Sequence, residues 1–117
     1  MRHKVKKIRL QVDKANATAL IRNLAMSVVI YEKIKTTESK AKVVVPFLDR
    51  LINIAKGEDK VTAIREVTRL IQHEDSSKKI IEVLVNKYKD RTSGYTRITK
   101  LGYRTGDNAS VVQLELI

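Results

Sequence analysis

Hydrophobic residues recur at helical spacing over four stretches of the chain. From Asn16 to about Glu32 they return every three or four positions, which places them on one face of a helix. The same spacing predicts three further helices, one between Thr37 and Gly57, one over residues 60–72 and one over residues 76–89. An interior proline costs a helix about 3 kcal/mol. We therefore expect the second helix to be kinked at Pro46 or to start late.

Three shorter stretches alternate polar and apolar residues, as strands with one buried face do. They are residues 33–36, 95–101 and 111–117. The loop between the last two, residues 102–109, is rich in Gly, Asp and Asn, so we expect a hairpin there. The sequence thus predicts an α+β fold with about four helices and a small mixed or antiparallel sheet, built as a single globular domain over residues 15–117.

Residues that commonly cap helices stand near three of the predicted starts. Asp13 or Asn16 precedes the first helix, and Thr37 precedes the second. The fourth helix has Asp75, Ser76 and Ser77 at its start. Side-chain oxygens at these positions can accept hydrogen bonds from the first backbone N–H groups of a helix, which have no partner within it.

The chain is strongly basic and has no cysteine. Its 117 residues include 24 Lys or Arg against 13 Asp or Glu, a net charge of +11, which indicates a polyanionic partner. The absence of cysteine excludes disulfides, thiolate nucleophiles and Cys-ligated metal sites. One Phe and four Tyr give little support to a sheet that stacks single-stranded bases. With no bilayer-spanning apolar run and no signal-peptide pattern, we expect a soluble cytoplasmic protein.

The positive charge is concentrated at two places. Residues 1–31 carry seven Lys or Arg against one Asp, residues 91–106 carry four with no acid, and residues 32–90 are nearly balanced. We expect residues 1–14 to form an extended basic arm that becomes ordered only against phosphates. Its candidate RNA contacts are Arg2, His3, Lys4, Lys6, Lys7 and Arg9. The alternative for this arm is a solvated tail.

The predicted strand over residues 95–101 has a basic side and an apolar side. Because side chains alternate along a strand, Tyr95, Arg97 and Thr99 share one side. Thr96, Ile98 and Lys100 share the other. We expect the first side to meet RNA while the second packs on helices.

The loop that follows this strand contains Arg104 between two glycines, Gly102 and Gly106. Glycine lets the backbone approach a phosphate closely, and arginine can bind a phosphate through two hydrogen bonds. A hairpin turn explains the glycines equally well, so both interpretations stay open. The Lys-Ser or Lys-Thr pair of a nucleotide-binding loop is missing.

The sequence offers few groups for catalysis or metal binding. His3 and His73 lie far apart in the chain without an obvious partner, so we expect both to be surface residues. The acidic pairs Glu58-Asp59 and Glu74-Asp75 fall at helix junctions, where capping and solubility are the expected roles. We predict no catalytic residue, no metal site and no cofactor.

Six short blocks follow one another through almost the whole chain. They are Met1-Arg2-His3, Arg22-Asn23-Leu24-Ala25, Ile34-Lys35-Thr36-Thr37 with Lys40-Ala41-Lys42, Leu51-Ile52-Asn53-Ile54-Ala55-Lys56, Gly94-Tyr95-Thr96-Arg97-Ile98, and Arg104-Thr105-Gly106-Asp107-Asn108-Ala109. In order and spacing they resemble the bacterial large-subunit ribosomal protein L17 family. Two places depart from the family pattern. Between Val5 and Ala19, lysines and apolar residues replace some Arg and His, and Pro46 lies earlier than the expected proline.

The resemblance implies a non-catalytic α+β domain that binds large-subunit ribosomal RNA near the exit of the nascent-chain tunnel. It implies a monomer within the ribosome, next to other large-subunit proteins and away from any membrane. The resemblance implies that four segments face RNA: the basic arm, the Arg22-Asn23 segment of the first helix, the Ile34-Lys35-Thr36-Thr37 turn and the hairpin from Gly94 to Ala109. Beyond the arm, the expected RNA-binding residues are Arg22, Asn23, Lys35, Thr36, Thr37, Lys40, Lys42, Tyr95, Arg97, Lys100, Arg104 and Asn108.

Three alternatives remain at this stage. The first is a DNA-binding architectural or regulatory protein, because a charge of +11 suits any nucleic acid. No convincing helix-turn-helix supports it. A small RNA-processing enzyme and a protein-interaction module that uses the helical face are the other two.

Overall fold

The computed structural model describes residues 13–117, so the predicted arm lies largely outside the described residues. The elements in order are α1 (Lys14–Tyr31), β1 (Lys33–Thr37), α2 (Glu38–Ala55), α3 (Lys60–Ile71), α4 (Glu74–Lys79), η1 (Ile80–Leu84), α5 (Val85–Lys87), β2 (Thr96–Tyr103) and β3 (Ser110–Leu116). Because α4, η1 and α5 follow without a break, they form the predicted fourth helix, with a π-helical turn at its centre. The α+β fold with four helices and a C-terminal hairpin is confirmed.

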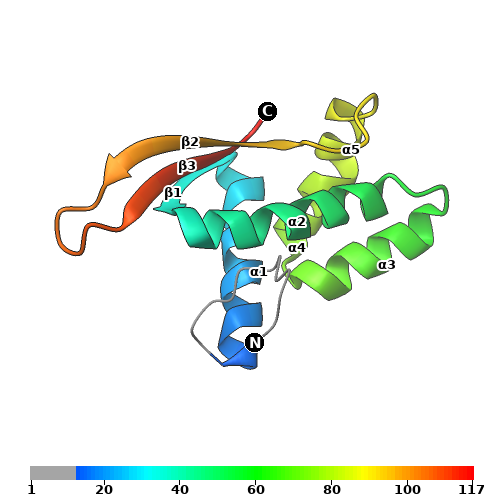
Figure 1. Ribbon diagram of the computed structural model, residues 1–117. Coiled ribbons are helices and arrows are strands. Elements are labelled where there is room, and N and C mark those ends of the chain that lie inside the picture. Colours follow the sequence, from blue (N-terminus) through cyan, green and yellow to red (C-terminus); the bar gives the residue numbers. More distant parts are fainter. Residues whose placement is uncertain (1–12) are drawn as a thin grey trace, which may run out of the picture.

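The sheet is antiparallel throughout, with strand order β1-β3-β2. Its central strand, β3, is therefore the last strand in the sequence. Strand β1, which follows α1 and is the first strand in the sequence, pairs with it. Figure 1 shows α1 and α2 against one side of the sheet, with the hairpin of β2 and β3 reaching beyond them. None of the helices formed by residues 13–117 covers the opposite side of the sheet (Figure 1).

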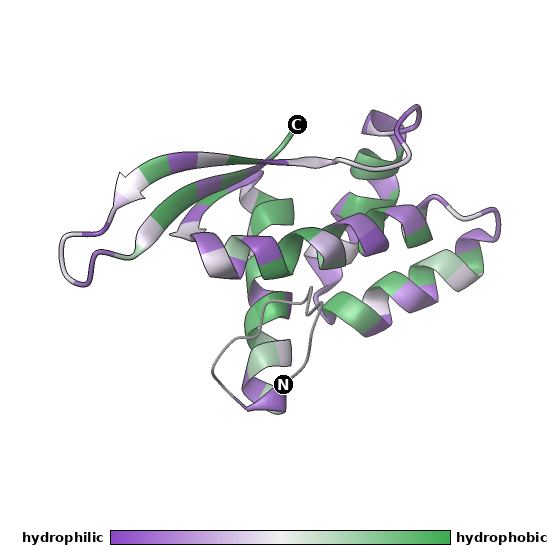
Figure 2. Ribbon diagram, viewed as in Figure 1, coloured by the Kyte–Doolittle hydropathy of each residue, from purple (hydrophilic) through white to green (hydrophobic). Residues whose placement is uncertain are grey.

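The core lies between the helices and the covered side of the sheet. Its largest members include Leu48 and Leu51 of α2, Val28 of α1 and Leu114 of β3, all fully buried. Figure 2 shows hydrophobic and hydrophilic residues in alternating bands along β3, as a strand with one buried face requires. Burial of apolar area at about 25 cal/mol per Å² is what holds the layers together.

Pro46 lies inside α2, and the helix runs through it from Glu38 to Ala55. The expectation of a late start is therefore wrong. Pro46 is on the exposed side of α2, whereas Val44 and Leu48 beside it are fully buried. Packing of this apolar face offsets the hydrogen bond that the proline cannot donate.

The helix starts follow the capping prediction only in part. Asp59 accepts hydrogen bonds from the backbone N–H groups of Val61 (3.1 Å) and Thr62 (3.5 Å), so its expected capping role is confirmed. Asp13 and Thr37 occupy N-cap positions of α1 and α2, but their side chains make no capping bond.

The fourth helix begins at Glu74, two residues earlier than predicted, and its N-cap is His73. The Nδ1 atom of His73 accepts a hydrogen bond from the backbone N–H of Ser76 at 3.2 Å. The expected capping by Asp75, Ser76 or Ser77 is wrong, because these residues already lie inside the first turn. His73 is therefore a half-buried capping residue and not a free surface histidine.

Candidate nucleic-acid interface

The uncovered side of the sheet gathers basic and polar side chains from all three strands. Val112, Leu114 and Leu116 of β3 are buried toward the helices, so the residues between them point the opposite way. We call this surface the sheet face. It comprises Lys33, Lys35 and Thr37 of β1, Val111, Gln113 and Glu115 of β3, and Arg97 and Thr99 of β2.

The strand register arranges this sheet face in rows. Glu115 of the central strand stands opposite both Lys33 and Arg97. In the next row, Gln113 stands opposite Lys35 and Thr99. Three cations therefore surround one acid on a surface that the described helices leave open, which is a suitable arrangement for binding phosphates.

Two predictions for β2 agree with this arrangement and one does not. Arg97 and Thr99 are exposed on the sheet face, and Thr96 and Ile98 are half-buried on the other side, as expected. Lys100 was expected to pack with Ile98, but it is exposed. At this point the pairing of β2 shifts at a bulge between Lys100 and Gly102, and the strand has already passed beyond the helices.

Tyr95 does not belong to the sheet face, so the expectation that it shares a side with Arg97 and Thr99 is wrong. Strand β2 begins one residue later, at Thr96, and the Tyr95 ring is fully buried. It lies 5.1 Å from the Tyr88 ring, and its hydroxyl donates a hydrogen bond to Asn53 Oδ1 at 2.5 Å. Lys56 also contacts it, with Nζ 3.2 Å from the hydroxyl. Tyr95 is therefore a core residue that lies immediately before β2.

Arg22 of α1 donates hydrogen bonds to the end of α3. Its Nε donates to the backbone carbonyl of Leu70 at 2.9 Å, and its Nη1 donates to Gln72 Oε1 at 3.3 Å. These acceptors lie at the C-terminal end of α3, where carbonyl groups lack partners within the helix. Arg22, which is half-buried, therefore caps the end of α3, and its neighbour Asn23 is exposed. Contact of either residue with RNA stays a prediction.

At the tip of the hairpin, Arg104 and Asp107 form a two-bonded ion pair. Arg104 Nε donates to one carboxylate oxygen at 3.0 Å and Nη2 to the other at 2.6 Å. The Arg104 hydrogen bonds, followed by the backbone N–H of Ala109, lower the pKa of Asp107 to about 2. The tip therefore presents an oriented guanidinium. Asn108, also exposed, adopts a positive φ of 56° and donates its N–H to the Arg104 carbonyl.

Gly102 has a φ of +127°, a conformation that L side chains rarely adopt. It lies at the bulge in β2 and not in the loop, since the strand continues to Tyr103. Turn and bulge geometry therefore accounts for Gly102. The predicted loop of residues 102–109 is shortened to residues 104–109.

The start of α2 contacts the hairpin at Ser110, the first residue of β3 after the loop. Glu38 forms an ion pair with Lys42 at 3.0 Å and accepts a hydrogen bond from the Ser110 hydroxyl at 3.0 Å. The Lys42 hydrogen bond, and then that of Ser110, lower the pKa of Glu38. Of the remaining expected residues here, Lys35 is exposed, and Thr36, Thr37 and Lys40 are half-buried. The charge of Lys42 is partly balanced by its own helix.

The sheet face contains residues that the sequence interpretation missed. Lys33, Gln113 and Glu115 join Lys35 and Arg97 there. Alternation within each strand indicates which residues share a side of that strand. Which residues of different strands lie next to each other depends on the strand order, β1-β3-β2. The predicted residues Arg2, His3, Lys4, Lys6, Lys7 and Arg9 lie outside the described part of the chain.

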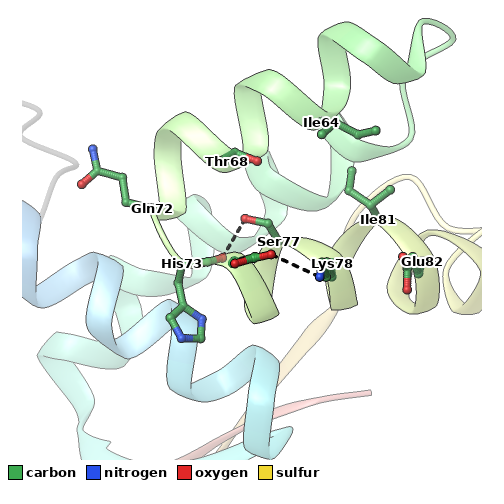
Figure 3. Close-up of a pocket in the computed structure, with 9 residues that line it drawn as sticks. Ile64, Thr68, Gln72, His73, Ser77, Lys78, Ile81 and Glu82 are labelled. Carbon is green, nitrogen blue, oxygen red and sulfur yellow. Dashed lines mark hydrogen bonds and ion pairs between the residues drawn. The ribbon is translucent and has the colours of Figure 1, made fainter.

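A groove lies between α3 and the fourth helix, with a volume of about 640 Å³. Figure 3 shows Ile64 and Ile81 facing each other across it, with Glu82 beside Ile81 and with Gln72 and His73 at the other end of the groove. The charges on its rim have both signs, and Lys78 pairs with Glu74 at 3.2 Å. This mixed and largely apolar groove is a poor match for a phosphate backbone.

Residues 13–117 contain no group of three or more His, Asp and Glu side chains positioned to hold a metal ion. Within the same range, no helix combines the length and the apolar character needed to cross a membrane.

Comparisons with known proteins identify the family. The family model described as ribosomal protein L17 matches residues 20–117. Proteins named large ribosomal subunit protein bL17 are similar over the whole chain. The protein from Rickettsia bellii is 40% identical, and the match spans 82% of its length. The protein from Hyphomonas neptunium is 38% identical over 83% of its length, and the protein from Solibacter usitatus is 41% identical over 77% of its length. The chain therefore belongs to the ribosomal protein L17 family, whose members are structural, non-catalytic proteins of the large ribosomal subunit.

Proposed function

We propose that this chain binds large-subunit ribosomal RNA through the sheet face and the tip of the hairpin. The observation that carries the proposal is the grouping of Lys33, Lys35 and Arg97 on the side of the sheet opposite the described helices. Cations held on a rigid sheet can contact several phosphates without a large loss of side-chain and backbone freedom. The protein would stabilise the folded RNA by neutralising charge where RNA segments approach each other.

The hairpin extends this surface beyond the helices. Lys100 and Arg104 are exposed along the projecting part of β2 and at its tip (Figure 1). The cations of residues 1–14 form the third part of the proposed interface. This division into a basic arm and a single domain over residues 15–117 is itself part of the proposal.

The finer assignments follow from membership in the family and from the motifs shared with it. We place the RNA site near the exit of the nascent-chain tunnel, in a cytoplasmic ribosome, with one copy of the chain per large subunit. Neighbouring large-subunit proteins are the expected protein partners. Cross-linking of the chain within purified large subunits, read out on both RNA and protein, tests these assignments.

The experiment that tests the binding surface compares two triple variants of equal charge. The first replaces Lys33, Lys35 and Arg97 with alanine. The second replaces Lys60, Arg65 and Lys89, which are exposed and lie outside the sheet face. Affinity for a large-subunit ribosomal RNA transcript is measured over a range of salt concentrations, with duplex DNA as competitor.

The proposal predicts that the first variant binds at least tenfold more weakly at moderate salt. Its plot of log affinity against log salt should be shallower by about 2 to 3, because each lost phosphate contact removes about one unit of slope. The second variant should stay close to the wild type, and DNA should displace the RNA poorly. Equal losses in the two variants would show that only net charge matters and would contradict a localised interface.

A further inference from the structure

Glu115 is the one acid on the sheet face, and its position there lacks an explanation in phosphate binding. It stands on the central strand, directly between Lys33 and Arg97 in the register. A carboxylate at this point repels phosphate and weakens the attraction of the cations beside it. A surface built only for phosphates would be stronger without it.

The carboxylate of Glu115 is loosely held by its neighbours. One oxygen lies 3.8 Å from Arg97 Nη1, and the other lies 3.4 Å from Gln113 Nε2. Both distances exceed the usual 2.7–2.9 Å of a charge-assisted hydrogen bond. For comparison, Arg104 donates two hydrogen bonds to the Asp107 carboxylate at 2.6 and 3.0 Å, one to each oxygen.

Glu115 therefore retains hydrogen-bonding capacity. An ionised carboxylate has about four lone-pair sites and can only accept. The side chain is about one-quarter exposed, so an incoming ligand can reach it from the open side of the sheet. The ligand group that suits it is an uncharged donor flanked by negative groups, because cations stand on both sides.

An RNA strand has this sequence of groups along its backbone, with a ribose 2′-hydroxyl between successive phosphates. The row Lys33–Glu115–Arg97 matches it as cation, acceptor, cation. Resting on the proposed function, we propose that Glu115 accepts a hydrogen bond from an uncharged O–H or N–H donor of the bound RNA. The ribose 2′-hydroxyl is the predicted donor, and it is the group that distinguishes RNA from DNA.

The test uses Glu115→Gln in the full chain, with Glu82→Gln as the control that removes the same charge from an exposed position outside the sheet face. The probes are a large-subunit ribosomal RNA fragment that the wild type protects and an all-deoxy strand of the same sequence. If Glu115 accepts from the 2′-hydroxyl, Glu115→Gln lowers the preference for RNA over DNA by about fivefold, because a neutral amide oxygen accepts a weaker hydrogen bond than a carboxylate. Glu82→Gln leaves this preference unchanged.

Three results separate the possibilities. Weaker binding of both probes by Glu115→Gln supports the acceptor role and assigns the donor to a base N–H. The same change for Glu115→Gln and Glu82→Gln overturns the proposal while leaving the proposed function intact. Wild-type chain that shows no preference for the RNA fragment contradicts the proposed function itself.

A role limited to orienting Arg97 is tested separately. In an Arg97→Ala background no such role exists, so Glu115→Gln would have no further effect on the preference for RNA. The proposal predicts that the loss of preference persists in that background. Matching thermal unfolding midpoints exclude a change in folding.

Discussion

The guanidinium of Arg104 and the carboxylate of Asp107 are joined by two hydrogen bonds at the tip of the hairpin, at 3.0 and 2.6 Å. The pair spans most of the short turn between β2 and β3. It leaves the outer edge of Arg104 exposed, so this cation is oriented before any ligand binds. Both oxygens of the Asp107 carboxylate therefore accept hydrogen bonds from residues of the tip itself.

This pair predicts an unusual titration. In Arg104→Gln, the pKa of Asp107 should rise from about 2 toward its ordinary 3.8, because its principal hydrogen-bond donor is gone. Because the folded pKa is the lower one, the pair contributes to stability above about pH 4 and loses that contribution as the pH falls through about 2. Carboxyl chemical shifts measured by NMR across this range give both midpoints. The Asp59 carboxyl, which caps α3 instead, should titrate identically in both proteins.

Tyr95 is predicted to matter for stability and not for RNA binding. Tyr95→Phe removes the hydroxyl that bonds Asn53 and Lys56, which should lower the free energy of unfolding by about 1 to 2 kcal/mol. Urea denaturation measures this loss. Tyr103→Phe is the matched control, because Tyr103 is 73% exposed and its hydroxyl should contribute less than about 0.5 kcal/mol. A Tyr95→Phe protein that is fully stable but defective in RNA binding would restore the original interpretation of this residue.

Arg22 is predicted to act through α3. Arg22→Ala should lower the free energy of unfolding by about 1 kcal/mol, since the Leu70 carbonyl loses its partner. The adjacent change Asn23→Ala should have little effect on stability, as Asn23 is exposed. Chemical denaturation and RNA affinity are measured on both variants. A tenfold loss of affinity in Arg22→Ala without a loss of stability would contradict the capping role.

The sequence predicted the helices and strands because each has its own hydrophobic period over many residues. The errors arise where a single residue decides the result. Strand β2 starts at Thr96 instead of 95, which frees Tyr95 to turn inward. Lys100 keeps the register of Ile98, opposite Val112, but it is exposed just before the bulge. A one-residue shift moves a side chain to the other face of a strand, and periodicity does not fix a boundary to that precision.

The other differences come from contacts between distant parts of the chain. The carbonyl that Arg22 caps lies 48 residues away, and no local pattern identifies it. Glu115 meets both Lys33 and Arg97 only because the last strand lies in the middle of the sheet. The composition of the basic surface was therefore predictable in part, whereas its one acid was not.

The central claim is that RNA lies against the sheet face. Lysine acylation read by mass spectrometry, on the free chain and on its complex with a large-subunit ribosomal RNA transcript, tests it most directly. We predict that RNA slows modification of Lys33 and Lys35 at least fivefold and leaves Lys60 and Lys89 unchanged, since salt-dependent phosphate contacts shield the lysines that make them. Unprotected Lys33 and Lys35 in the complex, or equal protection of all four lysines, would contradict the account.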